Sequence, residues 1–299
     1  MRADRVRSWI LTVAVAFLAQ PTSAEEFSVV SYNTHGLPSW IAGDDPEARF
    51  PRIGELANAY DIVLLQEDFE HHEALLTGTR HGFVARGNPS RDSLHCWISC
   101  SGSGLTFLTS LPRERVPRID NVPYGVCSGW LSNANDCLAT KGFQHARVTT
   151  GDGATVHLVN THLDAGSTAE DREARRQQLG ILQEHLLANA GGEALIVGGD
   201  LNLDASNSED VRLLEAFANA LGLTDSGARA APGSAWTVLD YLYHRSGSDT
   251  GLRVLDAGEA GEFTEAGTPL SDHPALFVRV ETYRRLEEPP STGMTAPVK

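Results

Sequence analysis

Five polar clusters constrain the fold of this chain most strongly, because each stands directly after a short apolar run. The clusters are Asn33, Gln66-Glu67, Asn160-Thr161-His162, Asp200-Leu201-Asn202 and Asp272-His273. The segment 61–67 is a short apolar run that ends in the acidic residue Glu67. This pattern is typical of a central strand buried on both faces. A chain that repeats this arrangement is expected to hold its strands inside an α/β domain.

Predicted strands and helices alternate along the chain and indicate the same fold class. Apolar or alternating runs predict strands at 27–33, 61–67, 105–109, 143–149, 155–160, 194–197, 237–243 and 274–280. Helical periodicity predicts helices at 46–59, 168–189 and 207–220. Loops are expected at 88–104 and 110–140. We therefore predict one α/β catalytic domain over 25–286, followed by a disordered tail over 287–299.

The first 24 residues have the pattern of a secretory signal peptide. A basic start is followed by the apolar run Trp9–Leu18, and a short segment then ends in the small residue Ala24. We expect cleavage after Ala24 and a secreted or periplasmic protein. The alternative is an uncleaved membrane anchor, although the apolar run is short for a bilayer span.

Export makes the four cysteines informative, because an even number in an oxidising compartment predicts two disulfides. Four cysteines allow three pairings. We favour Cys96–Cys100 and Cys127–Cys137, since each pair closes a short loop. A zinc site is the alternative, but the spacing of Cys96 and Cys100 fits it poorly.

The charge of the chain argues against a partner that binds by electrostatic attraction. The formal net charge is −15, and Lys141 is the only lysine before the final residue. An acidic protein gains nothing from attraction to nucleic acid or to anionic lipid. Arg172, Arg175 and Arg176 form the one concentrated basic stretch, on a predicted helix.

The polar clusters supply the residue types that a phosphate-cleaving site needs. Magnesium prefers hard oxygen ligands, and Glu67, Asp272 and the amide carbonyl of Asn33 offer them. Taken singly, each residue has an ordinary alternative: Asn33 suits a turn, and His162 suits a satisfied core histidine. The prediction of a phosphate-cleaving site rests on the occurrence of these residues together and in this order. Nine other histidines are expected to be structural or solvated, namely His35, His71, His72, His81, His95, His145, His157, His185 and His244.

Seven segments together resemble the endonuclease/exonuclease/phosphatase superfamily, the DNase I-like proteins. They are SYNTHGLP (31–38), DIVLLQE (61–67), GSGLTFLTSLP (102–112), VNTHLDA (159–165), VGGDLNL (197–203), LDYLY (239–243) and SDHPALFV (271–278). The resemblance implies a four-layer αββα sandwich, in which two mixed sheets pack face to face with helices outside. It also implies a metal-dependent phosphoric diester hydrolase, in which water attacks phosphorus in line.

The resemblance also implies a metal centre and the groups that orient its base. Glu67 resembles the main Mg²⁺ ligand, with Asn33 and Asp272 beside it, and Mn²⁺ or Co²⁺ are possible substitutes. His273 resembles the general base or, alternatively, a phosphate contact. Asp240 is expected to orient His273 through a carboxylate–imidazole hydrogen bond.

Four further residues of the motifs are expected to act on water or on the phosphate. Asp200 resembles the residue that positions or activates the attacking water, and whether it or His273 takes the proton stays open. Asn202 and His162 resemble donors to phosphate oxygens, with His162 also a candidate acid for the leaving group. Asn160 is expected to contact substrate.

One segment points to a particular branch of the superfamily. Residues 136–143 (DCLATKGF) resemble a segment of neutral sphingomyelinases in which an Asp and a Lys pair near the active site. Asp136 and Lys141 hold those positions, and NTHLDA also fits the sphingomyelinase version of its motif. The alternative is a surface lysine that leads into a hairpin.

One feature of secreted bacterial sphingomyelinases is missing. Their aromatic-rich hairpin should fall within 246–271, where Phe263 is the only aromatic residue. Trp97, Tyr124 and Trp130 could form a different lipid-facing surface, or could pack around the disulfides.

The first functional hypothesis is a secreted enzyme that splits sphingomyelin at a membrane surface into ceramide and phosphocholine, with no obligate protein partner. The alternative is a secreted DNase I-like nuclease or general phosphodiesterase, the one case in which nucleic acid is the partner. A non-catalytic scaffold would be expected to have lost residues such as Glu67, Asp200 or His273, and all three are present.

Overall fold

The computed structural model describes residues 24–43, 45–88, 102–129, 136–151, 153–229 and 238–285. The predicted signal peptide and tail, the Cys96–Cys100 pair, Trp97 and Trp130 lie outside these residues. The predicted Cys127–Cys137 disulfide is confirmed, with the two Cα atoms 5.3 Å apart. Within the described residues, no helix has the length and apolar character needed to cross a bilayer.

Two six-stranded mixed sheets form the centre of the described structure. The first sheet has the order β11 (Thr250–Glu259), β14 (Leu276–Arg284), β1 (Glu25–Asn33), β2 (Ile62–Gln66), β4 (Thr106–Thr109), β3 (Phe83–Arg86). The second has the order β5 (Ile119–Pro123), β6 (Gly142–Thr149), β7 (Thr155–His162), β8 (Ala194–Asp200), β10 (Asp240–Arg245), β9 (Thr224–Asp225). A small ribbon joins β12 (Thr264–Glu265) to β13 (Thr268–Pro269).

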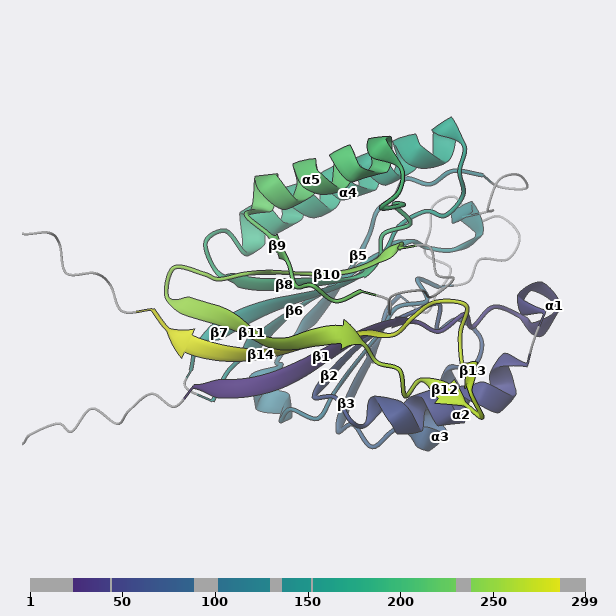
Figure 1. Ribbon diagram of the computed structural model, residues 1–299, viewed down its shortest axis with the longest axis horizontal. Helices are drawn as coiled ribbons and strands as arrows, with labels where there is room; N and C mark the ends of the chain where they lie inside the picture. Colours follow the sequence, from purple (N-terminus) through teal and green to yellow (C-terminus); the bar gives the residue numbers. More distant parts are fainter. Residues whose placement is uncertain are drawn as a thin grey trace, which may run out of the picture.

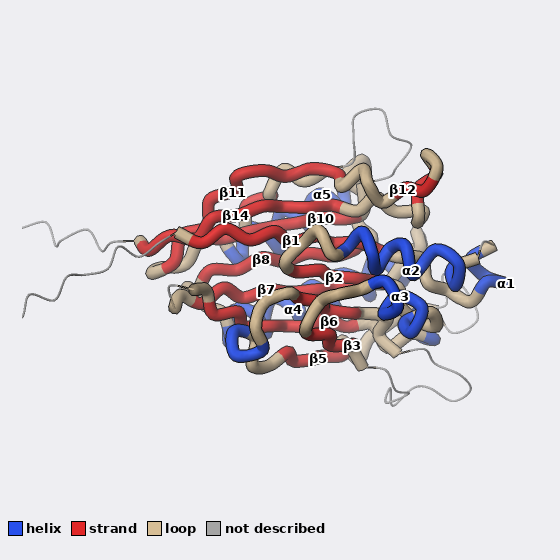
Figure 2. Tube along the Cα trace, turned by 90° about the horizontal axis from the view of Figure 1, so that it is seen from below, coloured by secondary structure: helices blue, strands red, loops and turns tan. Residues whose placement is uncertain are grey.

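Helices cover the outer face of each sheet, so the predicted four-layer αββα sandwich is confirmed (Figure 1). The helices α4 (Ala169–Asn189) and α5 (Ser208–Leu221) lie over the second sheet, and α2 (Pro46–Ala57) and α3 (His72–Gly78) lie over the first. The strands of the two sheets run in nearly the same direction (Figure 2), as in aligned sheet packing. The remaining short elements are α1 (Ser39–Ala42) and the 3₁₀ turns η1 (Arg113–Arg115) and η2 (Asp136–Leu138).

Three apolar clusters hold the four layers together. The cluster between the sheets contains Val29 and Leu64 from one sheet and Leu158 and Ile196 from the other, and all four side chains are fully buried. Separate clusters fill the space between each sheet and its helices. Burying an aliphatic side chain of this size contributes roughly 2 kcal/mol, so the central cluster fixes how the sheets face each other.

Local sequence signals set the ends of the long helices. The hydroxyl of Thr168 accepts a hydrogen bond from Asp171 N while the Asp171 carboxylate accepts one from Thr168 N, which forms a capping box at the start of α4. Asn207 caps α5, and Gly222 ends it in the left-handed conformation. These signals explain why helix limits were predicted closely.

Six strands form where the sequence analysis expected none, namely β3, β5, β9, β11, β12 and β13, and β11 and β5 are the longest of them. Residues 110–140 were predicted to be a loop, but β5 pairs with β6 at the edge of the second sheet. The segment 246–271 contains β11, a ten-residue strand that pairs with β14. Edge strands bury few apolar side chains, so their alternation is weak in the sequence. Phe263 is buried against Tyr32, with ring centroids 4.8 Å apart, and is not exposed to a membrane.

The buried His145 and His157 and the half-buried His185 form a row between the second sheet and α4. His145 Nδ1 lies 2.9 Å from His185 Nε2, and His145 Nε2 lies 2.7 Å from His157 Nδ1. His157 Nε2 in turn contacts the Glu193 carboxylate. Burial, together with the neighbouring His157 and His185, lowers the pKa of His145 to about 4.

We predict that this row of histidines makes the fold acid-sensitive. The unfolded state binds a proton at His145 below about pH 6.5 and the folded state only below about pH 4, so the free energy of unfolding falls as the pH drops through that window. His145→Gln should make the decline shallower, by up to about 1.4 kcal/mol per pH unit. Urea unfolding between pH 7 and pH 4 measures this, and an unchanged slope would contradict it.

Candidate active site

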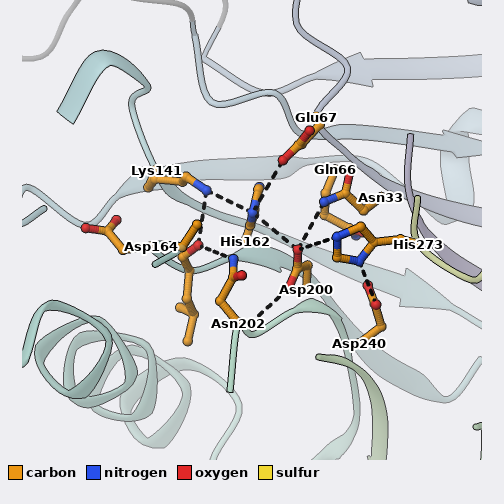
Figure 3. A network of polar contacts seen from close by, with 12 residues as sticks. Asn33, Gln66, Glu67, Lys141, His162, Asp164, Asp200, Asn202, Asp240 and His273 are labelled. Atoms are coloured by element: carbon orange, nitrogen blue, oxygen red, sulfur yellow. Dashed lines mark hydrogen bonds and ion pairs between the residues drawn. The ribbon is translucent and has the colours of Figure 1, made fainter. Parts of the chain in front are cut away.

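Parallel strand pairs bring four of the predicted polar clusters to one edge of the sandwich. In the first sheet β1 runs parallel to β2, with Asn33 level with Gln66. In the second sheet β7 runs parallel to β8, with His162 level with Asp200. Because all four strands end on the same side, their terminal side chains converge, as Figure 3 shows.

Backbone turns direct several of these side chains into the site. Of the described residues other than glycine, four have a positive φ, and three of these follow the strand ends: His35 (50°), Glu67 (56°) and Asn202 (49°). This conformation costs roughly 1–2 kcal/mol for a residue with a Cβ atom. The carbonyl of Glu67 accepts hydrogen bonds from Gly36 N and Phe69 N, which hold the turn in place.

Asn160 and Gln66 join the two sheets beneath the site. Gln66 Nε2 donates to Asn160 Oδ1 at 2.7 Å, and Asn160 Nδ2 faces the carbonyls of Leu65 and Thr106 and Gln144 Oε1 at 2.9–3.2 Å. Asn160 is fully buried. Asn160 was expected to contact substrate; because its amide is engaged within the fold, we infer that it positions the strand ends.

Asp200 is the buried acid on which the other groups converge. Its Oδ1 accepts a hydrogen bond from Asn202 N at 2.9 Å, and its Oδ2 accepts one from Asn33 Nδ2 at 3.0 Å. His162 Nε2 and His273 Nε2 lie 3.4 Å and 3.7 Å from the same Oδ2. Burial alone would raise the pKa of Asp200, but His273, His162 and Lys141 outweigh it and lower the pKa.

His273 is paired with Asp240 as the sequence analysis expected. His273 Nδ1 lies 2.8 Å from Asp240 Oδ2, and Asp240 is almost fully buried. Burial disfavours the charged imidazole, but the carboxylates of Asp200 and Asp240 outweigh it and raise the pKa of His273 to about 10. His273 is therefore a cation at neutral pH, which favours the phosphate-contact role over the role of base.

Lys141 keeps the imidazole of His162 in its neutral protonation state. Lys141 Nζ lies 2.8 Å from His162 Nε2 and 3.2 Å from Asp136 Oδ1, and all three side chains are buried. Burial lowers the pKa of His162 well below its usual range, and the charge of Lys141 lowers it further. His162 is therefore neutral, with Nε2 accepting a hydrogen bond from Lys141 Nζ, which argues against His162 as the acid for the leaving group.

The loop after His162 is held by two residues that the sequence analysis did not assign to the site. Arg175 is 1% exposed, and its Nη1 donates to the carbonyls of Asp164, Ala165 and Gly166. Asp164 accepts hydrogen bonds from Ser128 N and Gln178 Nε2. Burial and then the nearby Asp136 raise the pKa of Asp164 to about 6. A buried arginine cannot be recognised from helical periodicity, because its partners are backbone carbonyls.

The donor set around Glu67 fits a divalent cation. Glu67 Oε2 is buried and has no hydrogen-bond partner, and burial raises the pKa of Glu67 against the opposing effect of Lys141. Asn33 Oδ1 accepts one hydrogen bond, from His35 N, and keeps a second lone pair. The Asp272 side chain is 57% exposed, so its carboxylate can rotate toward Glu67.

A second group also has the spacing of a metal site. Among the described residues, Asp200, Asp240 and His273 offer ligand atoms within 4.8 Å of one another. Two of these are already bound to each other, and both Asp200 oxygens accept hydrogen bonds. A cationic His273 already balances the two carboxylates, so we favour Glu67, Asn33 and Asp272 as the metal ligands.

The comparisons agree with the fold. Residues 30–273 match the model of the Endonuclease/Exonuclease/phosphatase family. The chain belongs to this family of DNase I-like proteins. It is 29% identical to a sphingomyelinase of Mycobacterium tuberculosis over 292 residues, which covers 90% of this chain and 55% of that protein. The chain therefore spans about half the length of the relatives it matches.

Solved structures show the same fold. Sphingomyelinase C from Streptomyces griseocarneus superposes with a TM-score of 0.64 at 20% identity, covering 85% of this chain and 99% of that one. A beta toxin variant from Staphylococcus aureus with bound magnesium ions superposes with a TM-score of 0.62 at 15% identity, covering 87% of this chain and 100% of that one.

We predict that Asn160 supports the fold rather than the substrate. Asn160→Leu removes one buried hydrogen-bond partner each from Gln66 Nε2, Gln144 Oε1 and two backbone carbonyls, and should lower the free energy of unfolding by about 3 kcal/mol. The matched control is Asn189→Leu at an exposed position of α4, which should cost less than about 0.5 kcal/mol. Equal unfolding midpoints in urea for the two variants would argue against this role.

Proposed function

We propose that this chain is an exported, Mg²⁺-dependent phosphodiesterase that hydrolyses sphingomyelin to ceramide and phosphocholine. It would act on phospholipid at a membrane surface, in a secreted or periplasmic setting. The observation that carries the proposal is the buried contact from Asp136 through Lys141 to His162, which ends beside Asp200. The identity to a mycobacterial sphingomyelinase supports the same branch of the family.

The charges of the site suit attack of water on a phosphodiester. Asp200 is held as an anion and is the group best placed to accept the proton of the attacking water. His273 is held as a cation by Asp240 and would donate a hydrogen bond to a phosphoryl oxygen. Asn202 Nδ2 donates a hydrogen bond to Leu163 O at 3.0 Å, so the turn at Asn202 also orients the loop that follows Asp200.

Glu67, Asn33 and Asp272 would hold the metal ion. When bound, Mg²⁺ supplies charge stabilisation for the phosphoryl oxygens. The protein's own contribution is to place Asp200, His273 and Lys141 around the same point in a buried setting, where electrostatic effects are large.

Two observations count against the nuclease alternative. Arg175 is buried beneath the loop that follows His162, so it cannot contact a nucleic acid backbone. Arg176 is exposed but forms an ion pair with Glu173. Two of the three arginines of the concentrated basic stretch are therefore not free to line a cationic groove. Tyr124 is buried too, with its hydroxyl 2.6 Å from Thr161 Oγ1, and does not face a membrane.

The proposed activity predicts phosphocholine release from sphingomyelin in mixed micelles that depends on Mg²⁺ and stops with EDTA. Glu67→Gln serves as the site control and should lower turnover about 100-fold at limiting Mg²⁺, because one metal carboxylate is lost. A plasmid-nicking assay runs beside it. Nicking without phosphocholine release would move the chain to the nuclease alternative.

Lys141 should act on the chemistry and not only on the fold. Lys141→Met removes the charge beside His162 and should lower kcat about 100-fold, while the pKa of His162 rises in ¹⁵N NMR titrations. Lys141→Arg keeps the charge and should retain more of the activity. A Lys141→Met enzyme with normal kcat, or with an unchanged His162 titration, would contradict this role.

A further inference from the structure

His35 lies between the two carboxylates proposed to hold the metal. His35 Nδ1 is 3.1 Å from Asp272 Oδ1 and 3.8 Å from Glu67 Oε2. The sequence analysis treated His35 as an ordinary histidine, because it stands in a turn and not at a strand end. The structure gives it a defined position at the edge of the site.

The position of His35 is fixed by its backbone. Its N–H donates to Asn33 Oδ1 at 3.0 Å, and its carbonyl accepts from Arg49 Nη2 at 2.6 Å. Its φ of 50° is a conformation in which His, Asn and Asp are enriched. The backbone of His35 is therefore held in place between Asn33 and Arg49.

One tautomer of the ring suits metal ligation, and the contact with Ala42 favours it. His35 Nε2 faces the carbonyl oxygen of Ala42 at 3.4 Å, and an N–H at this position donates to it. The lone pair is then on Nδ1 and points toward the carboxylates of Glu67 and Asp272. Metal-binding histidines commonly donate their second ring N–H to a backbone carbonyl in this way.

In this tautomer the Nδ1 lone pair and the two carboxylate oxygens repel one another unless a cation lies among them. Around one octahedral ion with ligand distances of about 2.1 Å, neighbouring donor atoms are about 3.0 Å apart and opposite ones about 4.2 Å. The two distances from His35 Nδ1 fall within this range. Glu67 Oε2 is also buried without a hydrogen-bond partner.

We propose that His35 Nδ1 is a nitrogen ligand of the metal ion held by Glu67 and Asp272, and that it shifts the preference of the site toward Mn²⁺ and Co²⁺. Imidazole suits transition metals, whereas Mg²⁺ favours oxygen donors. The inference rests on the metal site of the proposed function and adds a specificity-determining residue to it.

The test uses Mn²⁺ as a spectroscopic probe of the purified full chain. Electron spin echo spectroscopy of bound Mn²⁺ detects a directly coordinated ¹⁴N nucleus without any substrate. We expect that coupling in the wild-type protein and its loss in His35→Asn. Asparagine tolerates the positive φ and offers a hard oxygen near the position of Nδ1.

Affinity gives an independent readout. In His35→Asn the Mn²⁺ dissociation constant should rise about tenfold, while the Mg²⁺ dissociation constant changes less than about threefold. The matched control is His185→Gln on α4, outside the site, which should keep both the ¹⁴N coupling and the affinities. Circular dichroism and thermal unfolding establish that each variant is folded.

Two results would overturn the inference: a ¹⁴N coupling that persists in His35→Asn, or wild-type protein that binds Mn²⁺ without nitrogen coupling. Failure to bind Mn²⁺ at millimolar concentration would overturn it as well. Nitrogen coupling without phosphocholine release would instead leave this ligand in place and reject the proposed substrate, so the two failures are distinguishable.

Discussion

The site depends on hydrogen bonds that cross from one sheet to the other. Apolar packing between the sheets fixes their distance, but only polar pairs fix which strand ends meet. Gln66 with Asn160, and Asn33 with Asp200, are two such pairs, and all four residues are buried. Each joins the end of β1 or β2 to the end of β7 or β8. Without them, only the apolar packing between the sheets would hold Glu67 and Asp200 in their relative position.

Charge balance follows from this arrangement. The strand ends bring Glu67, Asp200 and Asp240 into a buried space, where unpaired carboxylates are costly. Lys141 and His273 supply the compensating charge, which explains the position of the only internal lysine. The same charges set the roles that we propose, because Asp200 is held ionised and His162 neutral. Glu67 Oε2 has no hydrogen-bond partner, so a cation is still needed to stabilise this carboxylate.

Motif chemistry and strand ends could be predicted from the sequence because both depend on neighbouring residues. The buried β2 and the capped α4 carry their signals within a few positions. The strands β5 and β11 were missed, since edge pairing depends on a partner far away in the chain.

Side-chain roles were harder to predict than side-chain positions. Asn160 was placed correctly at a strand end, yet its partners come from three other strands, and only the fold shows that its amide is occupied. His35 gave no signal, because its importance arises from a positive φ and from two carboxylates distant in sequence.

The central claim is that the sheet edges assemble a metal centre at Glu67. Anomalous diffraction from Mn²⁺-soaked crystals tests it most directly, because the signal locates the ion without reference to activity. Our account predicts one strong peak among Glu67, Asp272 and His35. A peak among Asp200, Asp240 and His273 instead, with Glu67 unligated, would contradict it.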